Sequence, residues 1–229
     1  MSLQLEFIGH ACFRLWEDGK PAIVMDPFDY PTCSMEDTGF QLDADTVIVS
    51  SLADSALDNV ALVRNPKQVI NALDIAAAEI PDHPEGTDDN ALYAFKAGGL
   101  WFAHLGDVGF GLSPEDLAPW KDKCDVLLPI TGEKLTLKLD ELEPMIEFLQ
   151  PRWIVPMHYA LPPLGGADAG GMTYIDTFLN SRPRDPVYVV RHHVVELPLP
   201  TSPEGRPTIV ILEPAGYQAT GGFPSFACA

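Results

Sequence analysis

The chain has 229 residues, 46% of them hydrophobic, and its 33 acidic and 14 basic residues give a formal net charge of −19. This length and apolar content are sufficient for a complete hydrophobic core. The negative charge repels phosphate backbones and anionic lipids, so we expect no nucleic acid and no membrane surface among the partners.

The four cysteines are far apart, at positions Cys12, Cys33, Cys124 and Cys228, and none forms a C-x-x-C pair. This spacing excludes a zinc ribbon and is typical of reduced thiols. The first residues lack the basic and apolar regions of a signal peptide, and no apolar run is long enough to span a bilayer. We therefore expect a cytoplasmic protein.

The first half of the chain reads mainly as strands. Residues 3–16 and 22–25 predict a hairpin around the turn Asp18-Gly19. The β-branched run 46–49 predicts a buried strand that ends at Ser50 and Ser51. Further along, we expect a short helix at 57–63 and strands at 67–71 and 74–80.

The second half alternates strands with helices. Residues 91–104 predict a hairpin around Gly98-Gly99, and Ser113 followed by Pro114 predicts a helix start. Helices are also expected at 139–150 and 174–180, and strands at 126–129, 153–155, 187–190 and 194–197. We interpret residues 1–197 as one domain and residues 198–229 as an extension with one possible strand, 208–212, and a flexible end.

Several polar residues follow directly after apolar runs. They are Asp26, Asp54, His83, Asp107 and His158. The loops at strand ends are where α/β sheets place their ligand sites. Histidine and aspartate are common ligands of zinc and similar ions, so these residues are the candidates for a metal site.

Five segments carry a resemblance to a known family. They read L-E-F-I-G-H-A-C-F-R-L, I-V-M-D-P-F, H-L-G-D-V-G, D-V-L-L-P-I and P-R-W-I-V-P-M-H-Y. In order and spacing they resemble the metallo-β-lactamase superfamily, in the branch of bacterial metal-dependent hydrolases related to L-ascorbate-6-phosphate lactonase. The resemblance covers roughly residues 4–160. It implies an α/β fold, the four-layer αββα sandwich of two mixed β-sheets.

The resemblance also reveals a departure. Members of this family carry H-x-H-x-D-H after the strand that matches residues 47–49, and the motif binds two metal ions that activate a water. Here residues 51–56 read S-L-A-D-S-A, so the motif is degenerate. The resemblance implies that His83, Asp107 and His158 match later ligands of the family. His83 is followed by proline instead of aspartate, and no arginine or lysine is expected beside the site, which argues against phosphorylated substrates.

Three hypotheses follow. In the first, the protein keeps the fold, binds no metal and is non-catalytic or of altered activity, with a small molecule as a possible ligand. In the second, one Zn, Mn or Fe ion held by His83, Asp107 and His158, helped by Asp54, hydrolyses a small-molecule ester, lactone or amide. In the third, the chain is a scaffold that forms a homo-oligomer through its acidic surface or through residues 208–212.

Other residues of the expected pocket have narrower roles. Ser51 or Ser55 could act as a nucleophile if His83 or His158 served as its base, although G-x-S-x-G is absent. We expect His104 to support neighbouring loops and His10 to be a structural histidine. We expect Asp26 to bond the strand-exit backbone and orient the group at Ser51. His192 and His193 are expected within a strand, on opposite faces.

Overall fold

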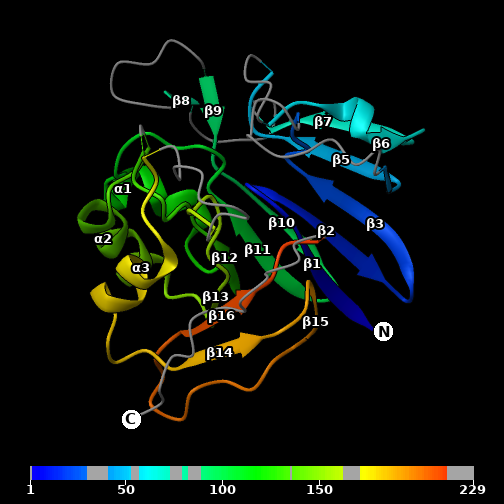
Figure 1. Ribbon diagram of the computed structural model, residues 1–229. Helices are drawn as coiled ribbons and strands as arrows, with labels where there is room; N and C mark the ends of the chain where they lie inside the picture. Colours follow the sequence, from blue (N-terminus) through cyan, green and yellow to red (C-terminus); the bar gives the residue numbers. More distant parts are fainter. Residues whose placement is uncertain are drawn as a thin grey trace.

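The computed structural model describes residues 2–29, 41–52, 57–72, 79–81, 89–134, 136–161 and 171–215. Two six-stranded β-sheets face each other, and the helices α1, α2 and α3 lie on the side of the second sheet that faces away from the first (Figure 1). Both sheets are mixed, which is the α/β arrangement expected from the sequence. Within the described residues, no helix is long and apolar enough to cross a bilayer.

The first sheet has the order β15-β1-β2-β3-β5-β7. Its antiparallel part pairs β15, β1, β2 and β3, and its parallel part pairs β3, β5 and β7. The strands are β1 (Leu3–Gly9), β2 (Cys12–Glu17), β3 (Lys20–Met25), β5 (Thr46–Val49), β7 (Gln68–Asn71) and β15 (Val194–Leu197).

The second sheet has the order β10-β11-β12-β13-β16-β14, and only the hairpin β10-β11 is antiparallel. Its strands are β10 (Tyr93–Ala97), β11 (Leu100–His104), β12 (Val126–Leu128), β13 (Trp153–Ile154), β14 (Val187–Val190) and β16 (Thr208–Leu212). All five residues of β16 are buried, and the strand is paired on both sides, to β13 and to β14. This strand therefore lies inside the sheet.

The remaining elements are short. Two small sheets pair β4 (Leu42–Asp43) with β6 (Val63–Arg64) and β8 (Glu79–Pro81) with β9 (Asp89–Ala91). The helices are η1 (Val60–Leu62), α1 (Pro114–Leu117), η3 (Ala118–Trp120), α2 (Leu139–Leu149) and α3 (Ile175–Ser181).

The alternation of side chains along β1 and β2 creates two hydrophobic clusters. Leu5, Phe7 and Phe13 point between the sheets into the main core. Because successive side chains of a strand point to opposite faces, their neighbours Ile8 and Cys12 face outward. There they pack in a second cluster with residues of β4, β6 and η1. In the described part of the chain, this cluster thus covers the outer face of the first sheet near the ends of β1, β3 and β5.

Most of the expected elements are present. Ser113 caps α1 with a reciprocal capping box to Asp116, and the predicted hairpin forms as β10 and β11. The helix expected at 57–63 is only the single 3₁₀ turn η1, because no side chain caps its start and β-branched valines flank the turn. Of the strand expected at 74–80, residues 74–78 lie outside the described residues, and Glu79–Pro81 form β8.

The expectation for His192 and His193 is wrong. They lie in a bend between β14 and β15, not within a strand. Their rings stack with centroids 4.2 Å apart and planes 22° apart. The alternation that would have separated the two side chains therefore does not apply.

Candidate functional site

The end of β5 is bound to the end of β3 through one carboxylate. Asp26, Ser50 and Ser51 are fully buried. The Oδ1 atom of Asp26 accepts the backbone N–H of Ser50 at 2.7 Å, and Oδ2 accepts the Ser50 hydroxyl at 2.9 Å. Asp26 therefore meets the strand-exit backbone at Ser50, one residue before the expected Ser51. Both oxygens of the carboxylate are engaged by protein donors.

His104, at the end of β11, is held in one tautomer. Its Nε2 lies 3.0 Å from the carbonyl oxygen of Ala11, and its Nδ1 accepts the N–H of Gly106 at 3.0 Å. Burial lowers the pKa of His104 to about 4. The imidazole is thus neutral at pH 7, and its 3.4 Å approach to Asp26 Oδ2 is not an ion pair. These bonds give His104 the loop-supporting role expected from the sequence.

Asn90 fills the space between the ends of β5 and β11. Its Oδ1 accepts the N–H of Asp107 at 2.9 Å, and its Nδ2 donates to the carbonyl of Leu105 at 3.3 Å. Gly106 has a φ of +59°, and a Cβ at this position would lie 2.4 Å from Asn90 Oδ1 and 2.8 Å from Ser50 Cβ. Only glycine fits so close to these two residues. The strand ends are therefore packed directly against one another.

His158 and His10 form a second group on the same side of the sheets. The backbone N–H of His158 donates to the carbonyl of His10 at 2.9 Å, and the two rings meet edge to face with centroids 4.2 Å apart. Burial lowers the pKa of His158 to about 4 and holds the pKa of His10 well below its usual value. Among the described residues, neither buried Nδ1 atom has a hydrogen-bond partner.

A lysine lies close enough to this histidine pair for its charge to act there. Lys134 is the second cause, after burial, of the lowered pKa of His158. The loop that carries it packs tightly, because a Cβ on Gly132 would lie 2.2 Å from the His158 carbonyl oxygen. Lys134 is thus the basic residue whose charge bears on His158, and the expectation that no arginine or lysine lies directly beside the site stays a prediction.

The structure brings together only some of the residues proposed from the sequence. Asp26, Ser51, His104, Asp107 and His158 are described at or near strand ends. Asp54, Ser55 and His83 lie outside the described residues. Sequence reasoning missed Asn90, which looked like a loop residue, and it left His10 as a structural histidine without connecting it to His158.

The described donors do not fit a two-metal centre. In the part of the chain that the structure describes, no three His, Cys, Asp or Glu side chains are grouped so that they could hold a metal ion. The carboxylate of Asp26 is already hydrogen-bonded to Ser50, and both ring nitrogens of His104 are occupied. The neutral hydroxyls of Ser50 and Ser51 are weak replacements for imidazole.

Ser50, Asp26 and His104 also do not form a nucleophilic triad. Such a triad needs the imidazole next to the serine, with the carboxylate behind it. Here the Ser50 hydroxyl donates to Asp26. The ring of His104 donates to Ala11 and accepts from Gly106. Among the described residues, no imidazole is therefore positioned to take the proton of the Ser50 hydroxyl.

The sequence matches known proteins over most of its length. The family described as the beta-lactamase superfamily domain matches residues 4–158. A UPF0173 protein of Pyrococcus furiosus is 29% identical over 183 residues, which cover 69% of this chain and 83% of that protein. A UPF0173 metal-dependent hydrolase of Carboxydothermus hydrogenoformans is 24% identical over 204 residues, covering 73% of this chain and 89% of that protein.

Solved structures show the same architecture. A Thermotoga maritima protein, described as a candidate Zn-dependent hydrolase of the metallo-β-lactamase superfamily, aligns with a TM-score of 0.64 and 25% identity. The alignment covers 92% of this chain and 98% of that one. Igni18, a metallo hydrolase of Ignicoccus hospitalis, aligns with a TM-score of 0.56 and 20% identity over 87% of this chain and 100% of that one. The second likeness concerns the fold alone.

Proposed function

The chain belongs to the beta-lactamase superfamily, and from this premise we propose that it is a metal-dependent-hydrolase-like member that has exchanged the two-metal centre for a hydrogen-bonded polar cluster. In this proposal residues 51–56 are a degenerate form of H-x-H-x-D-H, and the protein does not carry out two-metal hydrolysis. Its relation to the lactonase branch is part of the same proposal. The family membership fixes the scaffold, and the function is argued from the residues at the site.

One observation carries the proposal, namely the hydrogen bonding of the Asp26 carboxylate. Both of its oxygens accept hydrogen bonds from Ser50, at the point where β5 ends. Asn90 in turn bonds the backbone of Leu105 and Asp107 at the end of β11. A buried polar group that is satisfied by protein donors gains little from a metal ion, since binding would first break those bonds.

A second candidate function remains, in which one Zn, Mn or Fe ion is held by His83, Asp107 and His158. The buried Nδ1 of His158 favours it, because that nitrogen has no partner among the described residues. A three-ligand site with a bound water is typical of catalytic zinc, and the ion would lower the pKa of that water. The third hypothesis, assembly through Thr208–Leu212, has no comparable support, because both edges of β16 are already paired.

The experiment that separates the first two functions measures metal and rebuilds the motif. The variant Ser51→His, Ala53→His, Ser55→Asp, Ala56→His restores the family pattern. A matched control carries Ser51→Gln, Ala53→Gln, Ser55→Asn and Ala56→Gln, which are similar in size but poor ligands. We expect the natural protein and the control to purify without stoichiometric metal and without esterase or lactonase activity, while the rebuilt variant gains metal.

Two results would overturn this proposal. One is near-stoichiometric zinc, manganese or iron in the natural protein purified without chelators or a nickel column. The other is hydrolysis of an ester or lactone that disappears in the His158→Ala variant. Circular dichroism spectra must show that each variant is folded, because Ser51 is fully buried and its replacement can disturb packing.

A further inference from the structure

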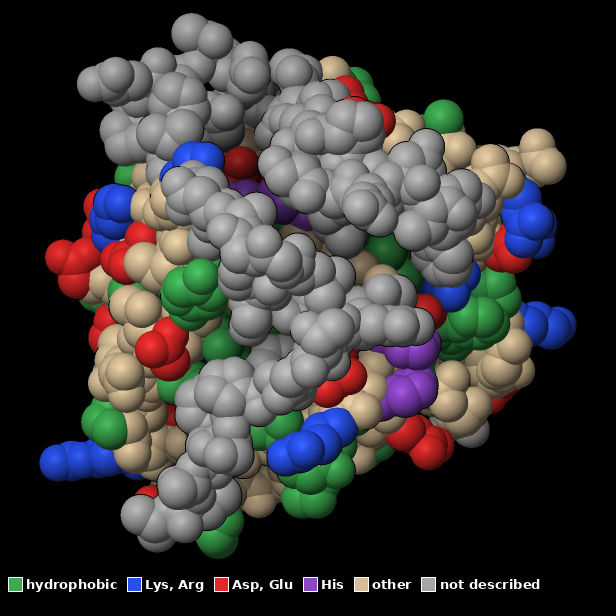
Figure 2. Space-filling view, viewed as in Figure 1, with side chains coloured by type: hydrophobic (Ala, Val, Ile, Leu, Met, Phe, Trp, Pro, Cys, Tyr) green, Lys and Arg blue, Asp and Glu red, His purple; other side chains and the backbone are tan. Residues whose placement is uncertain are grey.

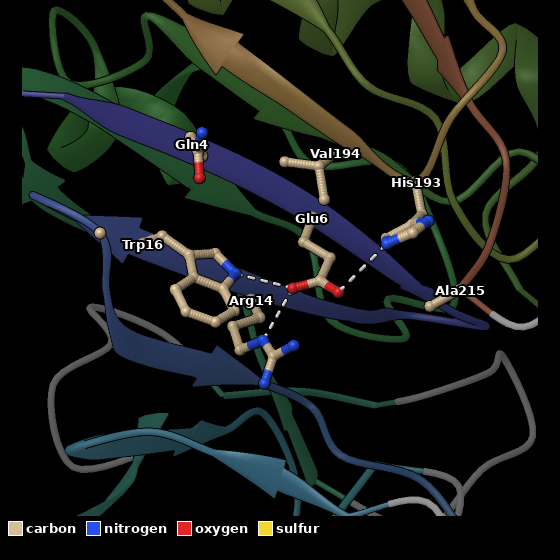
Figure 3. A pocket seen from close by; sticks show the side chains of 8 residues that line it. Gln4, Glu6, Arg14, Trp16, His193, Val194 and Ala215 are labelled. Atoms are coloured by element: carbon tan, nitrogen blue, oxygen red, sulfur yellow. Dashed lines mark hydrogen bonds and ion pairs between the residues drawn. The ribbon is translucent and has the colours of Figure 1, made fainter.

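A cavity of about 590 Å³ opens on the outer face of the first sheet, away from the strand-end site. It borders the second hydrophobic cluster, because Ala215 lines the cavity and also packs against that cluster. Figure 3 shows that side chains from β1, β2 and the start of β15 converge around it. Volumes of this size are typical of small-molecule sites.

Strand register brings the lining residues together. Glu6 of β1 lies opposite Arg14 of β2 on one side and Val194 of β15 on the other. Gln4 lies opposite Trp16 two residues away, on the same face. The rim is fixed by the backbone of Phe7, whose N–H donates to the carbonyl of His193 at 2.8 Å and whose carbonyl accepts the N–H of Ala215 at 2.9 Å.

The floor of the cavity carries a buried ion pair. Glu6 is 4% exposed and Arg14 is 8% exposed. One carboxylate oxygen of Glu6, Oε2, accepts both Arg14 Nε at 2.7 Å and Trp16 Nε1 at 2.7 Å. Among the described residues, the other oxygen, Oε1, is approached only by His193 Nε2 at 3.8 Å, which is too long for a hydrogen bond. Within this part of the chain, Oε1 accepts no hydrogen bond.

The guanidinium of Arg14 is also only partly used. Its Nε is bound to Glu6, and its plane lies over the Trp16 ring with Cζ 4.5 Å from the ring centroid. Among the described residues, no hydrogen bond reaches its two terminal nitrogens, and the exposed carboxylate of Asp43 is bound to Arg64 instead. In the described part of the chain, the side-chain nitrogen and oxygen atoms that are buried and lack a partner do not include any atom of Arg14 or Glu6. The atoms of these two residues that lack a partner are therefore accessible. The terminal nitrogens of Arg14 and the Oε1 of Glu6 are thus open to the cavity.

We propose that this cavity binds a small zwitterion of the α-amino acid class, with its carboxylate on the terminal nitrogens of Arg14 and its ammonium between Glu6 Oε1 and His193 Nε2. The guanidinium edge suits a carboxylate because it offers parallel N–H donors. Glu6 Oε1 and His193 Nε2 are too far apart for a direct bond, and an ammonium seated beside the pair, about 2.8 Å from each atom, donates one N–H to Oε1 and one to the unprotonated Nε2.

Two features define the ligand further. Because the ion pair is neutral as a whole, a ligand with one positive and one negative group leaves the buried charges balanced. Trp16, Val194 and Ala215 provide an apolar wall for a hydrophobic side chain. Figure 2 shows histidine side chains at the molecular surface, with acidic, basic and hydrophobic side chains around them. The inference does not depend on the proposed function, because the cavity shares no residue with the strand-end site.

Isothermal titration calorimetry with leucine and phenylalanine tests the proposal. The matched ligands are leucine methyl ester, which lacks the carboxylate, and N-acetylleucine, which lacks the ammonium. Each loses a charge-assisted hydrogen bond, so we expect each to bind at least about tenfold more weakly than leucine. The proposal is overturned if neither amino acid binds at about 10 mM, or if both derivatives bind as well as leucine.

Substitutions locate the binding. Val194→Phe should fill the cavity and weaken binding at least about tenfold, while Glu196→Gln, exposed on the same face of β15 and outside the cavity, should change it less than about twofold. If Val194→Phe disturbs folding, His193→Ala replaces it, because this partly exposed side chain can be removed safely. Unchanged affinity in both cavity variants would contradict the assignment.

Discussion

The first sheet buries two carboxylates, Asp26 at the end of β3 and Glu6 in the middle of β1, and the two differ in how many of their oxygens accept hydrogen bonds. Both oxygens of Asp26 accept hydrogen bonds from Ser50. Within the described residues, one oxygen of Glu6 accepts hydrogen bonds, from Arg14 and Trp16, and the other accepts none and faces a cavity. Burial of a charge therefore does not by itself indicate a binding site. A buried carboxylate indicates one when an oxygen is still able to accept a hydrogen bond.

Position along the strand explains the difference. At a strand end the backbone N–H groups are no longer used by the sheet, so Ser50 can offer its own N–H to Asp26. In the middle of β1 the backbone is paired to β2 and β15, and only side chains remain to serve Glu6. The strand-end cluster can close on itself, whereas the mid-strand carboxylate is left with an open oxygen.

The largest effect is expected at the ion pair. Glu6→Leu leaves the guanidinium of Arg14 buried without its partner and should lower the free energy of unfolding by about 3–5 kcal/mol in urea titrations. The double variant Glu6→Leu, Arg14→Met should recover much of that loss, because it buries no charge. Equal losses in the single and double variants would show that the two charges are not coupled.

A smaller loss is expected at the strand-end cluster. Asp26→Ala removes the acceptor of two buried Ser50 donors and should lower the free energy of unfolding by about 2–4 kcal/mol. Asp26→Asn keeps one acceptor oxygen and should lose less. The control Asp45→Ala breaks only the exposed pair with Lys67 and should stay within about 0.5 kcal/mol. A loss at Asp26 no larger than the control would mean that this cluster does not hold the strand ends.

The histidine behind Asp26 predicts a pH dependence. The folded-state pKa of His104, about 4, lies below the unfolded value of about 6.5. The unfolded chain therefore takes up the proton first, so stability is complete above about pH 6.5 and is lost as the pH falls toward 4. Between about pH 7.5 and pH 5 we expect the titration of this residue to lower the free energy of unfolding by about 2 kcal/mol.

The variant His104→Gln isolates that effect. Glutamine can still donate to Ala11 and accept from Gly106, but it does not titrate. Urea unfolding at both pH values should show a smaller acid loss in the variant than in the natural protein. Identical losses would indicate that His104 is not the responsible group.

The smallest effect is expected at the rim of the cavity. The His193 side chain is 38% exposed and reaches Glu6 only at 3.8 Å. Its removal in His193→Ala should change the free energy of unfolding by less than about 0.5 kcal/mol, as measured by thermal or urea unfolding. A loss above about 1 kcal/mol would show that the imidazole, rather than a ligand, completes the environment of Glu6.

The sequence predicted the elements better than it predicted the contacts. Hydrophobic alternation located β1 and β2, because a buried face imposes a period of two, the continuous β-branched run located β5, and the turn Gly98-Gly99 located the hairpin β10-β11. Helix α1 was predictable from its local capping residues. The position of Asp26 at a strand end was also predictable from the sequence. That its hydrogen-bond partner is Ser50 depends on how β3 and β5 pair.

Several features had no local signal. Asn90 follows acidic residues that the sequence predicts as a loop, and its role depends on the approach of Gly106 from the end of β11. His10 and His158 are far apart in the chain and meet only through the folded backbone. The cavity depends on the register of β15, β1 and β2, since Glu6, Arg14 and Val194 are adjacent only across strands. Periodicity specifies the face of a strand but not its neighbour.

The central claim is that the strand-end site no longer holds a metal centre, and the most direct test is elemental analysis of the protein purified without chelators and without a nickel column. The claim predicts that zinc, manganese and iron together stay far below one equivalent per chain, even after incubation with each ion and gel filtration. Near-stoichiometric metal that is lost in the His158→Ala variant would contradict it.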